Sequence, residues 1–96
     1  MYLDFSNNKV AALPKFSKKC DLVSINGSYN EIKSLDNLSG LENLNTVTMD
    51  YNKDLSSLKP LTECHKLIEV SVYGTKVKNS SALTEMSVIV NYDPVQ

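Results

Sequence analysis

Arginine is absent from this sequence of 96 residues, and all ten basic side chains are lysines. The chain therefore lacks the side chain that binds phosphate, carboxylate and guanine through two parallel hydrogen bonds. Charged residues make up 22% of the chain and the net charge is −1, so no overall positive field favours nucleic acid or an anionic membrane. No apolar run approaches the length of a membrane span. Neither nucleic acid nor a membrane is therefore expected as a partner.

Residues that build catalytic and metal sites are also scarce. His65 is the only histidine, and its neighbour Cys64 should point to a different face, which makes the two a poor nucleophile and base. We expect Cys64 in the core and His65 in solvent. Asp50 and Glu69 are candidate neighbours on a sheet, but nothing in the sequence indicates a cleft or a raised pKa. The three glycines are isolated, so there is no phosphate-binding loop. The sequence predicts no enzyme, no cofactor and no metal.

A pattern of apolar residues recurs about every 22 residues. Its clearest copy, within residues 22–41, matches L-x-x-L-x-L-x-x-N-x-L with one substitution, at Gly27. The frame returns at Leu44, Val47, Met49 and Asn52, and again at Leu67, Val70, Val72, Thr75 and Val77. A period in this range, with one Asn in each unit, is typical of a leucine-rich repeat solenoid.

The repeats follow one another along the chain and together form one domain, 1–96. We assign a partial repeat at 1–21, fuller repeats at 22–43, 44–66 and 67–86, and a truncated last repeat at 87–96. Leu3 aligns with Ile25 one period later, and the pattern restarts early at Val88. Cys20 and Cys64 lie two repeats apart, about 9–10 Å at the usual strand spacing, which is beyond the reach of a disulfide. Both are predicted to be free thiols.

Each part of the repeat has a structural interpretation. The alternating apolar residues predict short strands with one buried face, which stacking would bring into a parallel sheet. The residues in the Asn position (Asn8, Asn30, Asn52, and in part Thr75 and Asp93) are predicted to form a ladder of hydrogen bonds to neighbouring turns. Leucines at every third position of the return segments favour 3₁₀ turns over full α-helices. The expected fold is an α/β solenoid with a parallel sheet on its concave face and loops and 3₁₀ turns on its convex face.

These motifs resemble the 22-residue leucine-rich repeats of bacterial internalins and of eukaryotic phosphatase regulators. The resemblance covers nearly the whole chain and implies the fold, together with protein binding through the concave face. It implies little more about function, which in such proteins rests on variable surface residues. The helical N-terminal cap and the immunoglobulin-like C-terminal domain of internalins are not found in these 96 residues, so an adhesin role is not carried over.

The strand pattern also predicts which side chains face outward. If the central residue of each strand points into the core, its neighbours point to the opposite face. The predicted central residues are Leu3, Ile25, Val47, Val70 and Val88. The predicted outward rows are Tyr2, Ser24, Thr46, Glu69 and Ser87; Asp4, Asn26, Thr48, Ser71 and Ile89; and Ser6, Ser28, Asp50, Tyr73 and Asn91; a fourth row at the turns is Asn7, Tyr29, Tyr51, Gly74 and Tyr92. From these we select a candidate binding face of Asp4, Asn26, Ser28, Tyr29, Thr48, Asp50, Tyr51, Glu69, Ser71 and Tyr73.

Tyrosine, asparagine and serine are frequent in binding surfaces because they combine rigid area with adaptable hydrogen bonds. We expect a non-catalytic module that binds another protein and belongs to a larger bacterial protein; carbohydrate is a second class of ligand that tyrosines and amides can accommodate. Strand propensity and solubility alone would also place Thr, Ser and Tyr on an exposed sheet. The alternative function is a structural solenoid that self-associates through uncapped end strands, since Leu3, Phe5 and Phe16 lie in a first repeat with nothing before it.

The compartment is not fixed by the sequence. The segment at residues 1–5 lacks the basic region and apolar core of a signal peptide, so the chain is either cytosolic or a piece of a longer secreted or surface protein. Gly27 and Thr75 depart from the consensus at interior positions. We therefore expect modest stability that depends on neighbouring repeats.

Overall fold

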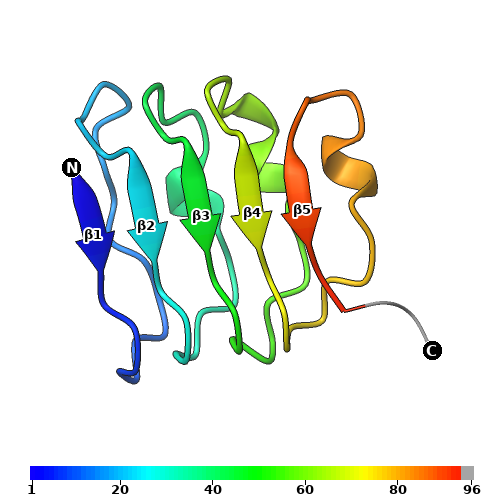
Figure 1. The fold of residues 1–96 in the computed structure, drawn as a ribbon. Helices are drawn as coiled ribbons and strands as arrows, with labels where there is room; N and C mark the ends of the chain where they lie inside the picture. Colours follow the sequence, from blue (N-terminus) through cyan, green and yellow to red (C-terminus); the bar gives the residue numbers. More distant parts are fainter. Residues whose placement is uncertain (94–96) are drawn as a thin grey trace.

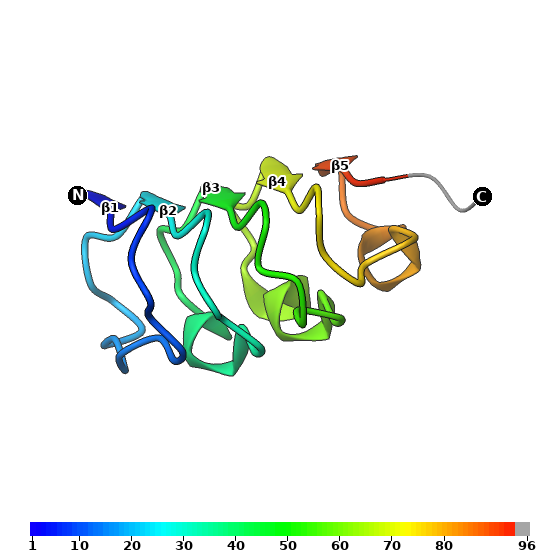
Figure 2. The same cartoon turned by 90° about the horizontal axis from the view of Figure 1, so that it is seen from below.

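The computed structural model describes residues 1–93 as a single sheet of five parallel strands, in the order β1-β2-β3-β4-β5 (Figure 1). The strands are β1 (Tyr2–Asp4), β2 (Ser24–Asn26), β3 (Thr46–Thr48), β4 (Glu69–Ser71) and β5 (Ile89–Asn91). Three return segments contain short 3₁₀ helices, which are η1 (Asp36–Leu38), η2 (Lys59–Glu63) and η3 (Ser81–Leu83). All three lie on one side of the sheet (Figure 2). The predicted short parallel strands and 3₁₀ turns are confirmed.

The strand register agrees with the sequence repeat at the first four strands. Ile25 pairs with Leu3 and with Val47, and Val47 pairs with Val70. The prediction for the last strand is wrong: Val90, and not Val88, pairs with Val70. The segment alternates with a period of two, so a slip of two residues leaves the inward and outward faces unchanged. The hydrophobic pattern alone therefore could not choose between the two registers.

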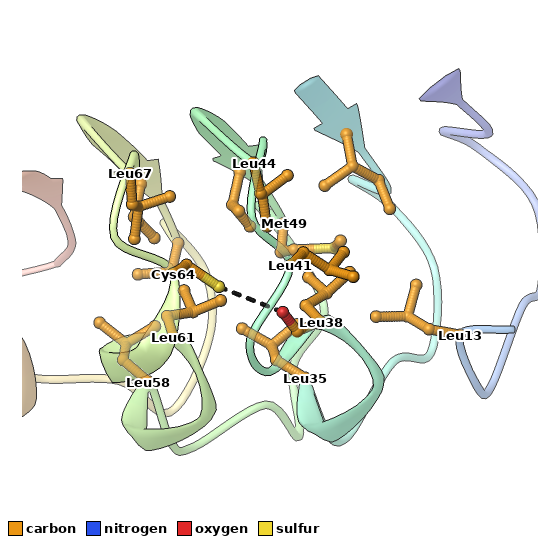
Figure 3. Packing of buried hydrophobic residues seen from close by; sticks show 14 of the residues in the cluster. Leu13, Leu35, Leu38, Leu41, Leu44, Met49, Leu58, Leu61, Cys64 and Leu67 are labelled. Carbon is orange, nitrogen blue, oxygen red and sulfur yellow. Dashed lines mark hydrogen bonds between the residues drawn. The ribbon is translucent and has the colours of Figure 1, made fainter. Parts of the chain in front are cut away.

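The core lies between the sheet and the 3₁₀ layer. Its strand side is formed by the central residues Ile25, Val47 and Val70, which are fully buried. Its other side is formed by leucines of the return segments, many of which Figure 3 shows packed together: Leu13, Leu35, Leu38, Leu41, Leu58 and Leu61. The threefold spacing of these leucines matches the three residues per turn of a 3₁₀ helix, which keeps them on one side. The sheet thus has one buried face and one face that carries no other layer among the described residues.

Two of the three asparagines predicted to form the ladder, Asn30 and Asn52, are buried and connect successive repeats, whereas Asn8 is exposed and bonds only its own turn. Asn52 is fully buried; its Oδ1 accepts the backbone N–H of Ile32 at 2.9 Å, and its Nδ2 donates to the carbonyls of Gly27 and Met49, both at 3.0 Å. Asn30 repeats this arrangement one repeat earlier. Each amide satisfies backbone groups of its own turn and of the preceding one, which would otherwise be buried without partners.

The ladder of side-chain bonds between repeats stops after Asn52. Thr75 is buried at the equivalent position, but its hydroxyl bonds only its own repeat, donating to Val72 and accepting from Val77. Asp93 was predicted at the next position and is not there. Because the register of β5 is shifted, Asp93 instead falls level with Tyr73, and its Oδ2 accepts the N–H of Gly74 at 2.6 Å.

Gly27 stands at a leucine position of the repeat, yet the space is filled. A Cβ atom built on Gly27 would lie 2.7 Å from Cζ of Phe5 and 2.8 Å from Sδ of Met49. These two larger side chains come from the preceding and following repeats and meet over the glycine. The departure from the consensus therefore leaves no gap at this position.

Restoring the consensus at Gly27 is expected to destabilise the protein. Gly27→Leu should lower the free energy of unfolding by about 1–3 kcal/mol, because it overfills a packed site. Chemical denaturation followed by circular dichroism would measure the change. In a Phe5→Ala background, which vacates part of the space, the cost of Gly27→Leu should fall; a stabilising effect of leucine in the wild-type background would refute this description of the packing.

Candidate functional site

The candidate face is the side of the sheet that points away from the 3₁₀ layer (Figure 2). Strand alternation places the first and third residue of each strand here, and in β2 and β3 these residues are half-buried around a fully buried centre. We call this side the outward face. As predicted, it presents Asn26, Thr48 and Ser71 in one row, with Asp4 at the start and Asn91 at the end. Ile89, which was predicted in this row, lies opposite Glu69 instead.

Hydrogen bonds tie the outward face together across neighbouring repeats. The hydroxyl of Ser28 accepts the backbone N–H of Asp50 at 3.1 Å. Asp50 Oδ1 in turn accepts the hydroxyl of Ser71 at 2.7 Å and the backbone N–H of Tyr73 at 2.8 Å. Three repeats are thereby connected through polar side chains. A surface held in this way needs little reordering when a partner binds.

Ser28 was predicted as a contact residue, but the structure buries it. Its side chain is buried, with 6% of the residue exposed. The hydroxyl turns toward the backbone of Asp50 in the next repeat, so it positions the face without presenting a group to solvent. Strand periodicity gives the direction of a side chain but does not tell whether a short polar one is covered by its neighbours.

Tyr29 and Tyr51 occupy unusual backbone conformations at the turn that follows each strand. Their φ angles are 58° and 59°, in the left-handed region, as are those of the equivalent Asn7 and Gly74. Asn and Gly adopt this region readily, whereas for most other residues it costs about 1–2 kcal/mol. The turn therefore imposes the same backbone at four successive repeats, and two of them carry a large aromatic side chain in spite of that cost.

The two tyrosine rings are stacked, and we call them the tyrosine pair. Their centroids are 4.7 Å apart and their planes differ by 18°. A Cβ built on Gly74 would collide with Cδ1 of Tyr51, so the Tyr51 ring lies close against the glycine backbone. The Tyr51 ring is thus placed between Tyr29 of the preceding repeat and Gly74 of the following one. Stacking contributes about 0.5–1.5 kcal/mol, which offsets part of the backbone strain.

The tyrosine pair remains accessible despite its packing. Tyr29 is 53% exposed and Tyr51 is 51% exposed, and Tyr73 nearby is 41% exposed. Stacking takes up one face of each ring of the pair, while ring edges and hydroxyl groups stay available to a partner. The sequence predicted these residues in the site, but it gave no sign of the stack.

Two exposed side chains beside the candidate face were not selected from the sequence. Tyr2 and Ile89 are 82% and 64% exposed and lie in the same row as Glu69, at the two ends of the sheet. Tyr2 was placed in this row but left out of the selection, whereas Ile89 was assigned to the neighbouring row because of the wrong register of β5. At each end of the sheet, this row therefore finishes with a large, partly apolar side chain.

Carboxylates on the outward face are separated from each other. Asp50 lies level with Tyr73, while Glu69 pairs with Thr46 near the beginning of the strands, so the two are not the close neighbours that the sequence suggested. Asp4 accepts both the N–H and the hydroxyl of Ser6 through Oδ1, and these bonds hold its pKa below the ordinary value. No close carboxylate pair of the kind used in acid–base catalysis is formed by Asp50 and Glu69.

Both cysteines are free thiols, as predicted. Cys64 is fully buried, and its Sγ donates to the carbonyl of Leu38 at 3.1 Å (Figure 3). Burial raises the pKa of the Cys64 thiol, which opposes formation of the nucleophilic thiolate. The side chain of His65 is 78% exposed and lies 3.5 Å from Glu63. Cys64 and His65 thus point to different environments, in agreement with the sequence prediction.

Within residues 1–93, no three His, Cys, Asp or Glu side chains are grouped as a metal site would require. The helices of this part of the chain are all too short to cross a membrane. No known family model matches the sequence, and no curated protein or solved structure matches it. Function is therefore inferred from the outward face and the tyrosine pair.

Proposed function

We propose that the chain is a leucine-rich repeat solenoid module that binds another protein, without catalysis, through the outward face. The recurring sequence frame and the five parallel strands in sequence order support the solenoid. On this proposal, the outward face corresponds to the concave surface of the solenoid. The tyrosine pair is the observation that supports the binding role most strongly.

The tyrosine pair stands on a strained backbone. At a position where the turn demands a left-handed backbone, Asn7 and Gly74 meet the demand at low cost. Tyr29 and Tyr51 do so at a higher cost, while about half of each side chain remains in solvent. Strained residues of this kind concentrate at functional sites, where a specific side chain is needed. A role in contacting a partner accounts for aromatic residues there better than folding stability does.

A polypeptide suits this surface better than a sugar. Sugar recognition by aromatic residues uses open ring faces, and the Tyr51 ring is covered by Tyr29 and approached by Gly74. Ring edges, hydroxyls and the polar row of Asn26, Thr48 and Ser71 remain, and these match the mixed apolar and hydrogen-bonding groups of a protein surface.

Removing the tyrosine contacts should abolish binding and leave the fold intact. We expect the double variant Tyr51→Asn and Tyr73→Ala to retain the wild-type circular dichroism spectrum, because Asn tolerates the left-handed backbone. Capture of the natural partner from cell lysate should fall by about tenfold or more, as for buried tyrosines at the centre of interfaces.

The control for this experiment is Ile68→Ala, which removes a side chain that is 52% exposed and precedes β4. Capture should be unchanged in this variant. Undiminished capture by the tyrosine variant would exclude binding through the outward face. Light scattering of the wild-type chain over a wide concentration range tests the alternative function, because a mass that grows with concentration would favour self-association.

A further inference from the structure

Formal charge on the outward face has only one sign. Four carboxylates belong to it and to the turns that follow its strands: Asp4, Asp50, Glu69 and Asp93. The segments that form the face (2–6, 24–29, 46–51, 69–74 and 89–93) contain no lysine, although the chain has ten. The lysines are confined to the turns and return segments. The nearly neutral chain therefore separates its charges, with the negative ones left on this side of the sheet.

The fold neutralises little of this negative charge. Among the described residues, the only one of these carboxylates with a lysine in ion-pair range is Asp93, whose Oδ2 lies 3.9 Å from Nζ of Lys78. Asp50 and Glu69 each have one oxygen bonded, Oδ1 of Asp50 to Ser71 and Tyr73, and Oε2 of Glu69 to Asn91 at 3.1 Å. Within residues 1–93, no hydrogen bond or ion pair reaches the second oxygen of either. These oxygens are available to a cationic partner.

We propose that the outward face binds a lysine- or arginine-rich segment of a partner protein. This inference rests on the proposed function and adds the chemistry of the partner. Opposite charges across an interface steer association and reject partners of the wrong sign. Cations would meet the carboxylates of Asp50 and Glu69, which lie on the lysine-free face and each keep one oxygen without a partner among the described residues. The same surface charge disfavours nucleic acid.

Octalysine and octaglutamate are the probes for this proposal. Each is titrated into ¹⁵N-labelled protein at low ionic strength while backbone amide shifts are recorded. Octalysine should give saturable shifts centred on Asp50, Glu69 and Tyr73, and octaglutamate should give none. The octalysine shifts should weaken at about 0.5 M salt, where exposed charges are screened.

Two double variants with the same net charge separate local recognition from a general charge effect. Asp50→Asn with Glu69→Gln and Asp36→Asn with Glu85→Gln each remove two negative charges, so both change the net charge from −1 to +1. Asn at position 50 keeps an oxygen for Ser71 and Tyr73. Asp36 and Glu85 are exposed in the return segments, at η1 and after η3. The first variant should bind octalysine about tenfold more weakly than wild type, and the second should bind it nearly as wild type does.

Equal binding by the wild type and the first variant would overturn the proposal, as would an equal loss in both variants or shifts centred on the return segments. None of these outcomes decides whether the outward face binds a protein at all, which the Tyr51 and Tyr73 variant tests. If that variant loses its natural partner while the Asp50 and Glu69 variant does not, the outward face binds a protein that is not basic. If the tyrosine variant keeps its partner, the proposed function itself fails.

Discussion

Replacing Asn52 with alanine is expected to lower the free energy of unfolding by about 3–5 kcal/mol, the largest effect of any single substitution considered for this chain. The Asn52 side chain is fully buried and serves the N–H of Ile32 and the carbonyls of Gly27 and Met49. Alanine would leave these backbone groups buried without partners, at about 1–3 kcal/mol for each group. Small domains are stable by only about 5–15 kcal/mol, so a large part of the protein would unfold at moderate temperature.

The matched control for this substitution is Asn8→Ala. Asn8 occupies the same position in the first repeat, but it is exposed, and its Nδ2 donates to the carbonyls of Phe5 and Ser6. Water can replace those bonds, so the loss should stay below about 1 kcal/mol. Urea denaturation of both variants would provide the comparison. Similar losses at positions 8 and 52 would show that burial of the amide has no special importance.

Gly74→Ala should also destabilise the protein strongly, by about 2–5 kcal/mol. Gly74 has a φ of 67°, and a Cβ there would collide with Cδ1 of Tyr51 and lie 2.8 Å from Cε1 of the same ring. A left-handed alanine costs about 1–2 kcal/mol, and displacement of a packed ring costs a further 1–3 kcal/mol. The melting temperature, measured by calorimetry, should fall by about 8 °C or more for a domain of this size.

A double-mutant cycle with Tyr51 separates the two contributions. In a Tyr51→Asn background the ring is gone, and Gly74→Ala should cost only the backbone part, about 1–2 kcal/mol. The difference between the two backgrounds measures the contact between ring and glycine. If Gly74→Ala costs the same in both backgrounds, the Tyr51 ring does not lie where the structure places it.

The sequence was sufficient to predict the elements whose chemistry repeats. Apolar alternation located the first four strands in the correct register, and the threefold spacing of leucines distinguished 3₁₀ turns from α-helices. The roles of Asn30 and Asn52 were predictable because a polar residue that recurs within an apolar frame is buried and needs backbone partners. The register of β5 was not predictable, because Val88 and Val90 satisfy the inward pattern equally well. Since Val88 was chosen, Asp93 was also predicted at the wrong position.

The candidate site was less predictable than the fold. Strand period indicated which residues of β2, β3 and β4 face outward, but exposure depends on neighbours, as the buried Ser28 shows. The tyrosine pair arises from a backbone conformation in which tyrosine is uncommon, and local propensity argues against it. The packing at Gly27 was not predictable from the local sequence either, because Phe5 and Met49 fill the space from the preceding and the following repeat.

The strand order has a consequence for how such a chain can change during evolution. Within residues 1–93, each strand pairs only with the strands immediately before and after it in the sequence, and no segment crosses from one end of the sheet to the other. Duplication or deletion of one whole unit would therefore preserve the kind of junction that joins every remaining pair. The length of the molecule can vary in steps of one strand, and the footprint available to a partner varies with it.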